Sequence, residues 1–276
     1  MPTRADGLIG KRRTRWPGVL AIVILGFLLV PVIFADWLAP YPPARIAIRE
    51  RLQPPSRVHP FGTDDFGRDL LSRVLHGARI SLGTSGAIIC MAGTVGIVLG
   101  LAAGYFGGRT DFVIMRVTDL FFTFPSFILA MAIAAVLGPS IGNLVIAVTV
   151  VWWPSYCRLV RSEAIRVRTQ PYVEAALALG ATPIRIIVRH VLPNCMRTIL
   201  VKATTDVAYT LLTVSGLNFV GLGAQPPTPE LGSMVAAARP YIMEYPWWAT
   251  FPGLAILLSA TGFAFLGDFL EDKVKA

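Results

Sequence analysis

Charged residues are scarce in this sequence. Asp, Glu, Lys and Arg together make up 15% of its 276 residues, whereas a soluble domain usually carries about 25%. Apolar residues account for 54%, and they form uncharged stretches close to the roughly 20 residues that a helix needs to cross a bilayer. This composition excludes an ordinary soluble globular domain and predicts an all-α integral membrane protein.

Cysteine is also rare, with three residues in the whole chain. Cys90, Cys157 and Cys195 lie in or beside apolar stretches, and no two of them have the spacing of a disulfide framework or a metal site. We therefore expect three inert thiols in the protein core.

The three histidines and the glutamates of the basic regions suggest no catalysis. His59, His76 and His190 fall in different loops on both predicted sides of the membrane, so a shared metal site is not expected. Glu163 and Glu174 lie in a basic region without a partner histidine or cysteine. We interpret these two carboxylates as surface or docking residues, and we expect no catalytic residue and no cofactor in this chain.

A phosphate-binding loop is missing. The chain has no Gly-x-x-x-x-Gly-Lys-Ser/Thr pattern, and its nearest approach, Gly10-Lys11, lacks both the upstream glycine and the downstream hydroxyl. If this protein works with ATP, the nucleotide and its Mg²⁺ must bind to a separate polypeptide. The chain itself is not expected to be an enzyme.

Positive charge, by contrast, is in excess, with a formal net charge of +9. Such an excess is typical of nucleic-acid-binding proteins. Here, however, the basic residues occupy the gaps between apolar stretches, where they determine the topology of membrane proteins. We therefore expect contact with membrane lipid and no nucleic-acid partner.

The uncharged stretches predict about six transmembrane helices. The stretch 120–157 is interrupted by Gly138-Pro139-Ser140, which predicts a tight turn between two spans. Pro31 and Pro125 are expected to kink the first and third spans. A cleaved signal peptide is the alternative for the first stretch, but its bulky exit at Asp36-Trp37 favours a retained anchor. The predicted spans are 17–35, 80–108, two within 120–157, 199–222 and 247–267.

Basic residues gather in alternate gaps, which marks the cytoplasmic side of a membrane protein. These gaps are the N-terminal tail, a loop after the second span with Arg109 and Arg116, the region after the fourth span, and the C-terminal tail. We expect both termini in the cytoplasm, and an odd number of spans would contradict this. The predicted organisation is a tail and first helix over 1–36, an extracytoplasmic segment over 37–78, a transmembrane domain over 79–268 and a cytoplasmic tail over 269–276.

The most informative segment is the basic region 158–194. Glu174, Ala175 and Ala176 start a short helix rich in small residues, and Gly180 is a position where this helix can end. A second, amphipathic helix is expected to run to Pro193. Its apolar positions are Ile184, Ile187, Val188 and Val191. A compact helical hairpin of this kind can dock into a groove of a partner protein.

These residues resemble a known signature. Glu174-Ala175-Ala176, Gly180 and Leu192-Pro193 resemble the EAA motif of permease subunits in ATP-binding-cassette importers, although His190 stands where the family favours an apolar residue. The resemblance implies that this region is the cytoplasmic coupling helix, which sits in a cleft of the ATPase subunit. The alternative interpretation is a basic loop that only sets the topology.

Two further segments narrow the resemblance. Residues 59–82 read HPFGTDDFGRDLLSRVLHGARISL, and residues 215–232 read SGLNFVGLGAQPPTPELG. Both resemble the second, C-type permease of dipeptide, oligopeptide and nickel importers. The resemblance implies the type I importer transmembrane fold, a second homologous permease, two ATPase subunits with their ATP and Mg²⁺, an extracytoplasmic binding protein and a bacterial cytoplasmic membrane. It favours short peptides as substrates, with nickel or another small solute as the alternative.

Several local contacts can also be predicted. Thr63 or Asp64 is expected to cap a short helix along the outer membrane surface, and Asp69 is expected to pair with Arg73. Lys202 and Asp206, four residues apart, are expected to pair at the membrane edge. The short surface helix would carry Leu70, Leu71, Val74 and Leu75 on one face, and a repeat of small residues in the second span would let helices approach closely: Ala92, Gly96, Gly100 and Gly104.

Two rival functions from other classes remain at this point. An ion-coupled secondary carrier usually has an internal repeat and buried ionisable groups in its spans. The sequence has no convincing repeat, and ionisable residues are scarce inside the predicted spans. A membrane scaffold without transport activity is the second rival.

Overall fold

The computed structural model describes residues 16–274, and every regular element in this range is helical. The basic N-terminal tail before Trp16 lies outside the described residues. The elements are α1 (Trp16–Ile33), α2 (Ala35–Leu38), η1 (Ile48–Glu50), α3 (Leu70–Phe106), α4 (Gly108–Phe122), α5 (Ser126–Leu137), α6 (Ile141–Arg168), α7 (Pro171–Ala178), α8 (Pro183–Ile186), the π-helical turn η2 (Ile187–Val191), α9 (Leu192–Phe219), α10 (Leu231–Ala238), η3 (Arg239–Tyr241) and α11 (Pro246–Val274).

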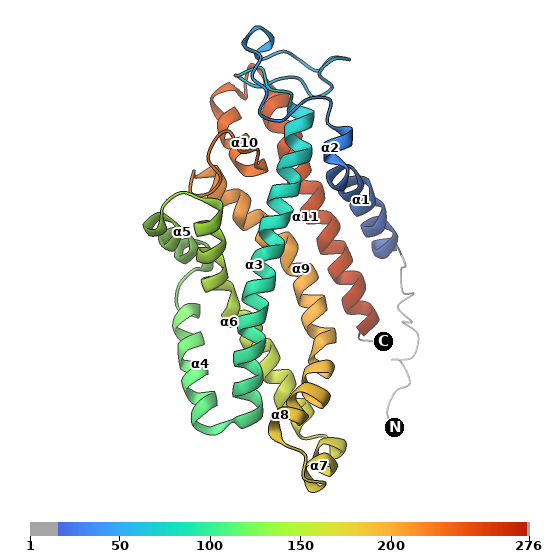
Figure 1. Cartoon of the computed structure of the whole chain (residues 1–276), viewed down its shortest axis with the longest axis vertical. Coiled ribbons are helices and arrows are strands. Elements are labelled where there is room, and N and C mark those ends of the chain that lie inside the picture. The colour runs from blue at the N-terminus through green and yellow to red at the C-terminus, as the bar shows by residue number, and fades with distance from the viewer. Residues whose placement is uncertain (1–15, 275–276) are drawn as a thin grey trace, which may run out of the picture.

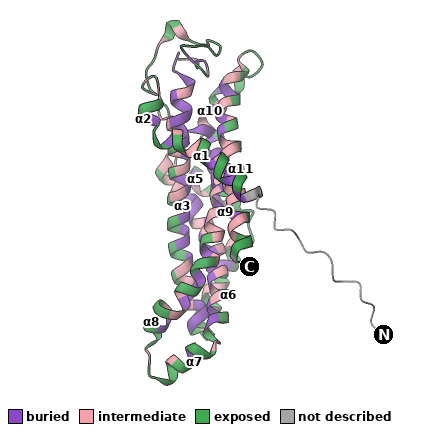
Figure 2. Ribbon diagram, turned by 90° about the vertical axis from the view of Figure 1, so that its right-hand side faces the viewer, coloured by how far each residue is buried: buried purple, intermediate pink, exposed green. Residues whose placement is uncertain are grey.

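The long helices form an elongated bundle with a different structure at each end (Figure 1). At one end, which we call the loop end, the segment 39–69 lies over the start of α3 beside α10. At the other end, the hairpin end, α7 and α8 project beyond the bundle. Buried residues line the inner sides of the long helices, and exposed residues cover most of α7 and α8 (Figure 2).

Helices α3 and α6 make the most extensive packing in the bundle, and glycines allow it. A Cβ atom added at Gly96, Gly100 or Gly104 would lie 2.6–2.7 Å from a backbone oxygen of α6. The predicted close approach at this small-residue repeat is therefore confirmed. Since the backbones touch over more than two turns, α3 and α6 behave as one rigid unit.

The predicted turn between the third and fourth spans is also confirmed. Gly138 has a positive φ of 88°, and Asn143 donates side-chain hydrogen bonds to the carbonyls of Leu137 (2.7 Å) and Gly138 (3.0 Å). The Ser140 hydroxyl caps α6 by accepting from the Asn143 amide at 3.0 Å. These contacts satisfy the groups that a tight turn leaves unpaired.

The third span differs from the prediction because it is sharply broken. Pro125 was expected to kink it, and here α4 and α5 meet at 88° across Thr123–Pro125. The segment with Arg109 and Arg116, expected to be a loop, forms part of α4. A proline disfavours helical geometry at the residue before it, which explains why the chain turns here instead of bending gently.

The described residues contain three helices that are long and apolar enough to cross a membrane, namely α3, α6 and α11. The bent pair α4–α5 forms at most a fourth span, and the apolar part of α1, Gly18–Ile33, is shorter. Helix α9 is long but carries Lys202 and Asp206. With the bent pair, α1 and α9 the total would be six, so the count of six stays a prediction.

The start of α3 corrects two predictions. Residues 70–75 do not form a separate surface helix, since they are the first turns of the continuous α3. Its cap is Asp69, and neither Thr63 nor Asp64 caps it: the Asp69 carboxylate accepts from the Ser72 amide at 2.8 Å and from the Ser72 hydroxyl at 2.7 Å. Leu70 and Val74 instead pack against α10 and α11.

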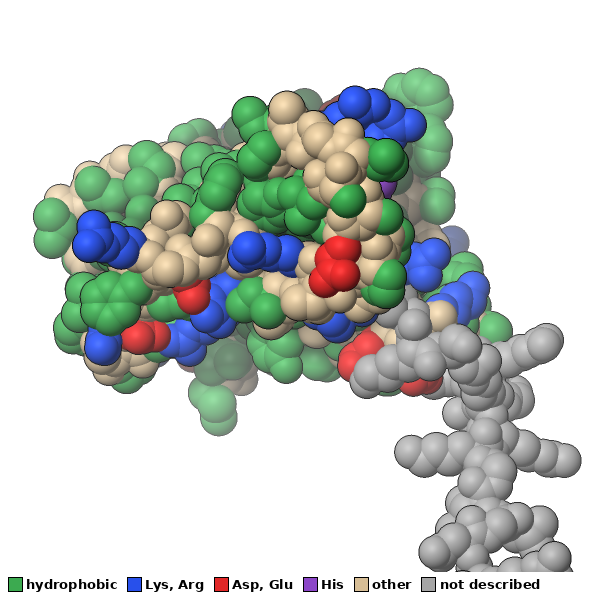
Figure 3. Space-filling model, turned by 90° about the horizontal axis from the view of Figure 1, so that it is seen from below, with side chains coloured by type: hydrophobic (Ala, Val, Ile, Leu, Met, Phe, Trp, Pro, Cys, Tyr) green, Lys and Arg blue, Asp and Glu red, His purple; other side chains and the backbone are tan. Residues whose placement is uncertain are grey.

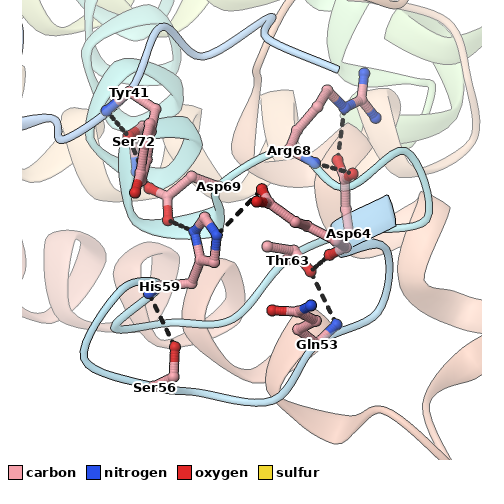
Figure 4. Close-up of polar contacts among 10 residues, drawn as sticks. Tyr41, Gln53, Ser56, His59, Thr63, Asp64, Arg68, Asp69 and Ser72 are labelled. Carbon is pink, nitrogen blue, oxygen red and sulfur yellow. Dashed lines mark hydrogen bonds and ion pairs between the residues drawn. The ribbon is translucent and has the colours of Figure 1, made fainter. Parts of the chain in front are cut away.

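The predicted Asp69–Arg73 pair is wrong because both residues have other partners. Figure 4 shows the contacts of His59 with Asp69 and of Arg68 with Asp64. His59 Nδ1 lies 2.9 Å from Asp69 Oδ1, and its Nε2 lies 3.5 Å from Glu50. Asp64 accepts from Arg68 Nε at 2.6 Å and lies 3.5 Å from Arg73 Nε. These groups are nearly all buried, so each charge is compensated inside the loop end.

Replacing Asp69 by asparagine should lower the stability of the loop end by about 1–2 kcal/mol, because the asparagine amide has one acceptor oxygen and leaves either Ser72 or His59 without its acceptor. The adjacent Asp65→Asn is the control. Burial, together with the Asp64 carboxylate, raises the pKa of Asp65, so removing its charge should cost nothing. Thermal unfolding of the purified complex measures the stability of both variants. Equal unfolding midpoints for Asp69→Asn and Asp65→Asn would contradict the role assigned to Asp69.

Candidate functional site

The predicted helical hairpin is present at the hairpin end of the bundle. Helix α7 contains Glu174, Ala175 and Ala176, and begins at Pro171, three residues before the predicted start. Proline is favoured there because the first helical position needs no amide donor. The helix is therefore present as predicted, but it begins three residues earlier, at Pro171.

Gly180 ends this helix as predicted. Its φ is +81°, a left-handed conformation that glycine adopts without strain. The Ala181 amide donates to the Ala176 carbonyl at 3.1 Å, and the Gly180 amide donates to the Leu177 carbonyl at 2.9 Å. This pair of bonds is the Schellman motif, which turns the chain sharply towards α8.

The second half of the hairpin differs from the prediction in two ways. No helix ends at Pro193; instead α8 passes through the π-helical turn Ile187–Val191 into α9, with Leu192 and Pro193 in its first turn. A wider turn accommodates the proline, which has no amide to donate. The same turn shifts the register, so the buried residues are Ile186 and Val191, while Ile184 and Val188 are exposed.

One face of the hairpin is anchored in the bundle. Val173, Ile186 and Val191 are fully buried and pack with residues of α3 and α6. These partners are Leu101, Tyr105, Val160, Ala164 and Val167. The hairpin is therefore packed firmly against the end of the α3–α6 unit, and a displacement of α7 has to move these helices as well.

The opposite face of the hairpin exposes large apolar side chains. Leu179 is 89% exposed and Ile184 73% exposed. Tyr172 and Val188 are also exposed. Viewed from this end, apolar surface lies between basic and acidic side chains (Figure 3). Exposed apolar groups of this size gathered on a protruding element are typical of a docking surface for another protein.

Glu174 lies at the edge of a cavity between the hairpin and the bundle. The cavity has a volume of about 420 Å³ and lies against the end of α3, the start of α4 and the end of α6. Besides Glu174 and Leu177, its lining includes Gly104, Gly107, Asp111, Arg168 and Thr169. A carboxylate beside an arginine and open space is available for polar contact with a docked partner.

The structure therefore brings four of the predicted residues into one hairpin. Glu174, Ala175 and Gly180 are exposed, and Ala176 is half-buried. Leu192 and Pro193 lie where the hairpin joins α9, so they shape its base. The exposed Leu179, Ile184 and Val188 complete the docking face. The sequence indicated their apolar character but not their exposure, which depends on how the hairpin packs against the bundle.

The structure also places the predicted ion pair and the three cysteines. Lys202 Nζ lies 3.1 Å from Asp206, which confirms that pair. Cys157 and Cys195 are buried free thiols, whereas Cys90 is exposed, contrary to the expectation of a core position. Among the described residues no cluster of His, Cys, Asp or Glu has the geometry of a metal site.

Comparisons with known proteins cover nearly the whole chain. A family model described as binding-protein-dependent transport system inner membrane component matches residues 96–276, and one described as N-terminal TM domain of oligopeptide transport permease C matches residues 13–55. The first match includes the hairpin and the second includes α1.

Curated relatives of similar length also align with the chain. The "Probable D,D-dipeptide transport system permease protein DdpC" of Escherichia coli (strain K12) is 43% identical over 92% of this chain and 85% of that protein. The "Dipeptide transport system permease protein DppC" of Alkalihalophilus pseudofirmus is 44% identical over 92% and 83%. The "Nickel transport system permease protein NikC" of Escherichia coli (strain K12) is 39% identical over 95% and 94%.

Proposed function

The chain belongs to the family of binding-protein-dependent transport system inner membrane components, and on that premise we propose that it is one permease subunit of an ATP-driven importer of short peptides. The observation that carries this proposal is the anchored hairpin with its exposed apolar face, because a permease without its own phosphate-binding loop must receive work through a contact with another chain. ATP and Mg²⁺ belong to that other chain.

The proposed docking residues are Glu174, Ala175, Ala176 and Gly180, with Leu192 and Pro193 holding the base of the hairpin. Small residues on α7 allow close approach of a partner, and the exposed Leu179 and Ile184 supply apolar contact area. An ATPase subunit that closes on ATP would displace the hairpin. Since the hairpin is packed against α3 and α6, its displacement would tilt the transmembrane helices between inward-facing and outward-facing states.

The proposed complex contains this chain, a second homologous permease, two ATPase subunits and an extracytoplasmic binding protein. The hairpin end would face the cytoplasm and the loop end would face the binding protein. The first described residue of α1 and the last of α11 both lie away from the loop end (Figure 1), which supports cytoplasmic termini. The proposed extracytoplasmic part is 37–78, followed by the transmembrane domain over 79–268.

Short peptides are the proposed substrates because relatives named as dipeptide permeases align over nine-tenths of the chain. Nickel is the second candidate, since a relative named as a nickel permease aligns over a similar length. Selection between them is assigned to the binding protein, which meets the substrate first. Ligands that protect the purified binding protein from thermal unfolding would identify the substrate class directly.

Replacing Leu179 by aspartate should weaken ATPase binding about 10- to 100-fold, because it places a charge in the centre of the apolar docking face. The measurement is capture of the ATPase subunits by the purified permease pair. Met243→Asp is the matched control, since Met243 is 91% exposed but lies between α10 and α11 near the loop end. Capture that is equal for both variants would refute docking at the hairpin.

Reconstitution in proteoliposomes separates the proposed importer from its rivals. The importer requires uptake that depends on the ATPase subunits, the binding protein and ATP together. Uptake that persists without any ATPase subunit would indicate an ion-coupled carrier. No uptake by the complete and ATP-hydrolysing complex would indicate a scaffold.

A further inference from the structure

Helix α4 is a short helix with a break in the helical backbone at each end. At its start, Gly107 and Gly108 have positive φ angles of 67° and 54°. At its end, Thr123–Pro125 separates it from α5 by the 88° bend. Thr118 is its single buried residue, while Ile114, Met115 and Phe121 are partly buried against the core. With so little fully buried surface, the position of α4 relative to the rest of the bundle also depends on specific polar contacts.

Two acid–arginine pairs supply these contacts, and both tie α4 to α6. Arg161 donates two hydrogen bonds to the Asp111 carboxylate, one from Nε to Oδ1 and one from Nη2 to Oδ2 at 2.6 Å. Arg158 forms an ion pair with Asp119. The forked contact between Arg161 and Asp111 fixes the direction of the carboxylate as well as its distance. Asp111 and Asp119 are eight residues, or about 12 Å, apart along α4. The two pairs therefore fix both the position of α4 along α6 and the rotation of α4 about its own axis.

Aromatic contacts reinforce the attachment of α4 to α6 near the C-terminal end of α4. The guanidinium carbon of Arg158 lies 4.1 Å from the centroid of the Phe122 ring. The rings of Phe121 and Trp153 meet edge to face with centroids 5.5 Å apart. Arg158 therefore holds α4 through a carboxylate and a ring at once, immediately before the bend to α5.

Helix α6 in turn continues to the hairpin. It ends at Arg168, and two residues separate it from the start of α7. The glycine contacts with α3 stiffen the C-terminal half of α6. Arg161 lies seven residues, or about 10 Å, before that end. The arginines thus stand between the docking surface and the broken span.

We propose that Arg158 and Arg161 are positioning residues that fasten α4 to α6 throughout the transport cycle. Movement of the hairpin passes along α6 to α4, and the bend at 123–125 takes up the change in angle between α4 and α5. The inference rests on the proposed import function and names the residues that transmit it. The role assigned to the two arginines requires no contact with nucleotide or substrate.

The test compares Arg161→Gln with Arg161→Lys in proteoliposomes that contain the complete complex. The glutamine variant removes the charge, and uptake per ATP hydrolysed should fall about tenfold. The lysine variant keeps one ionic contact and should recover at least a third of the parent ratio. Arg166→Gln is the control, because it removes an exposed pair with Glu163 on the same helix and should keep the parent ratio.

The ratio distinguishes positioning from a purely structural role. A purely structural defect lowers uptake and ATP hydrolysis in the same proportion and leaves their ratio unchanged. An unchanged ratio in Arg161→Gln would therefore overturn the inference. If Arg161→Gln fails to assemble, Arg158→Gln, whose ion pair is more exposed, takes its place in the same assay.

A distance measurement in the parent protein tests the same claim without altering either arginine. Spin labels at the exposed positions 113 and 162, with the exposed Cys90 replaced by serine, report the separation of α4 and α6. A separation that stays constant between nucleotide-free and ATP-trapped states supports the inference, and a change of several ångströms refutes it. If the unlabelled complex shows no ATP-dependent uptake, the proposed function fails instead.

Discussion

Replacing Gly100 by leucine should prevent stable folding of the transmembrane bundle. A Cβ atom at this position would lie 2.6 Å from the Cys157 carbonyl oxygen and 2.8 Å from the Val160 Cβ. Both obstacles belong to α6 and cannot rotate away, so α3 and α6 would have to separate. Overpacking of this kind costs on the order of 3 kcal/mol or more, a large part of the stability of a typical protein.

The measurement is the yield of membrane-inserted protein, followed by thermal unfolding of any complex that assembles. Gly83→Leu is the matched control on the same helix, because no atom lies within 4 Å of a Cβ added at Gly83. We expect near-normal yield for this control and almost none for Gly100→Leu. A folded Gly100→Leu complex with the parent midpoint would disprove the tight α3–α6 contact.

Replacing Gly180 by valine should abolish transport while leaving membrane insertion intact. A β-branched residue at a φ of +81° is strained, by roughly 1–2 kcal/mol or more, so the chain would leave the Schellman turn and reorient the exposed Leu179. Apart from Gly180 itself and its two chain neighbours, no residue of this chain has an atom within 4 Å of a Cβ at this position. The added bulk would therefore be felt by the docked partner and by the turn, and not by the bundle.

Uptake and ATP hydrolysis in proteoliposomes measure this effect. We expect uptake to fall at least 100-fold, with ATP hydrolysis no longer stimulated by the loaded binding protein. Gly180→Asn is the control, since asparagine tolerates the left-handed conformation, and it should retain a substantial part of the uptake. Normal uptake by the valine variant would remove the hairpin from the transport mechanism.

Local sequence features predicted the elements that depend on near neighbours. The turn at Gly138–Ser140, the end of α7 at Gly180 and the Lys202–Asp206 pair each involve residues within a few positions of one another. The glycine repeat of α3 predicted close helix packing because its spacing places the glycines on one face. The family resemblance then assigned this architecture to a permease.

Several of the predictions that differed required long-range information. The partners of Asp69 and Arg73 are His59 and Asp64, which the fold of the loop end brings to the start of α3. Arg158 and Arg161 were interpreted only as basic residues of the region 158–194, because their partners lie about 40 and 50 positions away in α4. Spacing along the chain carries no sign of such pairs.

The sequence by itself thus determined that this protein lies in a membrane, that it carries a helical hairpin whose first helix ends at Gly180, and that it has no phosphate-binding loop. These properties follow from hydropathy, local backbone preference and the absence of a motif. Only the tertiary structure decided which face of the hairpin is exposed, how sharply the third span breaks and which carboxylates the arginines of α6 hold. Those properties depend on the π-helical turn and on packing between distant helices, and single-chain periodicity does not encode the geometry of either.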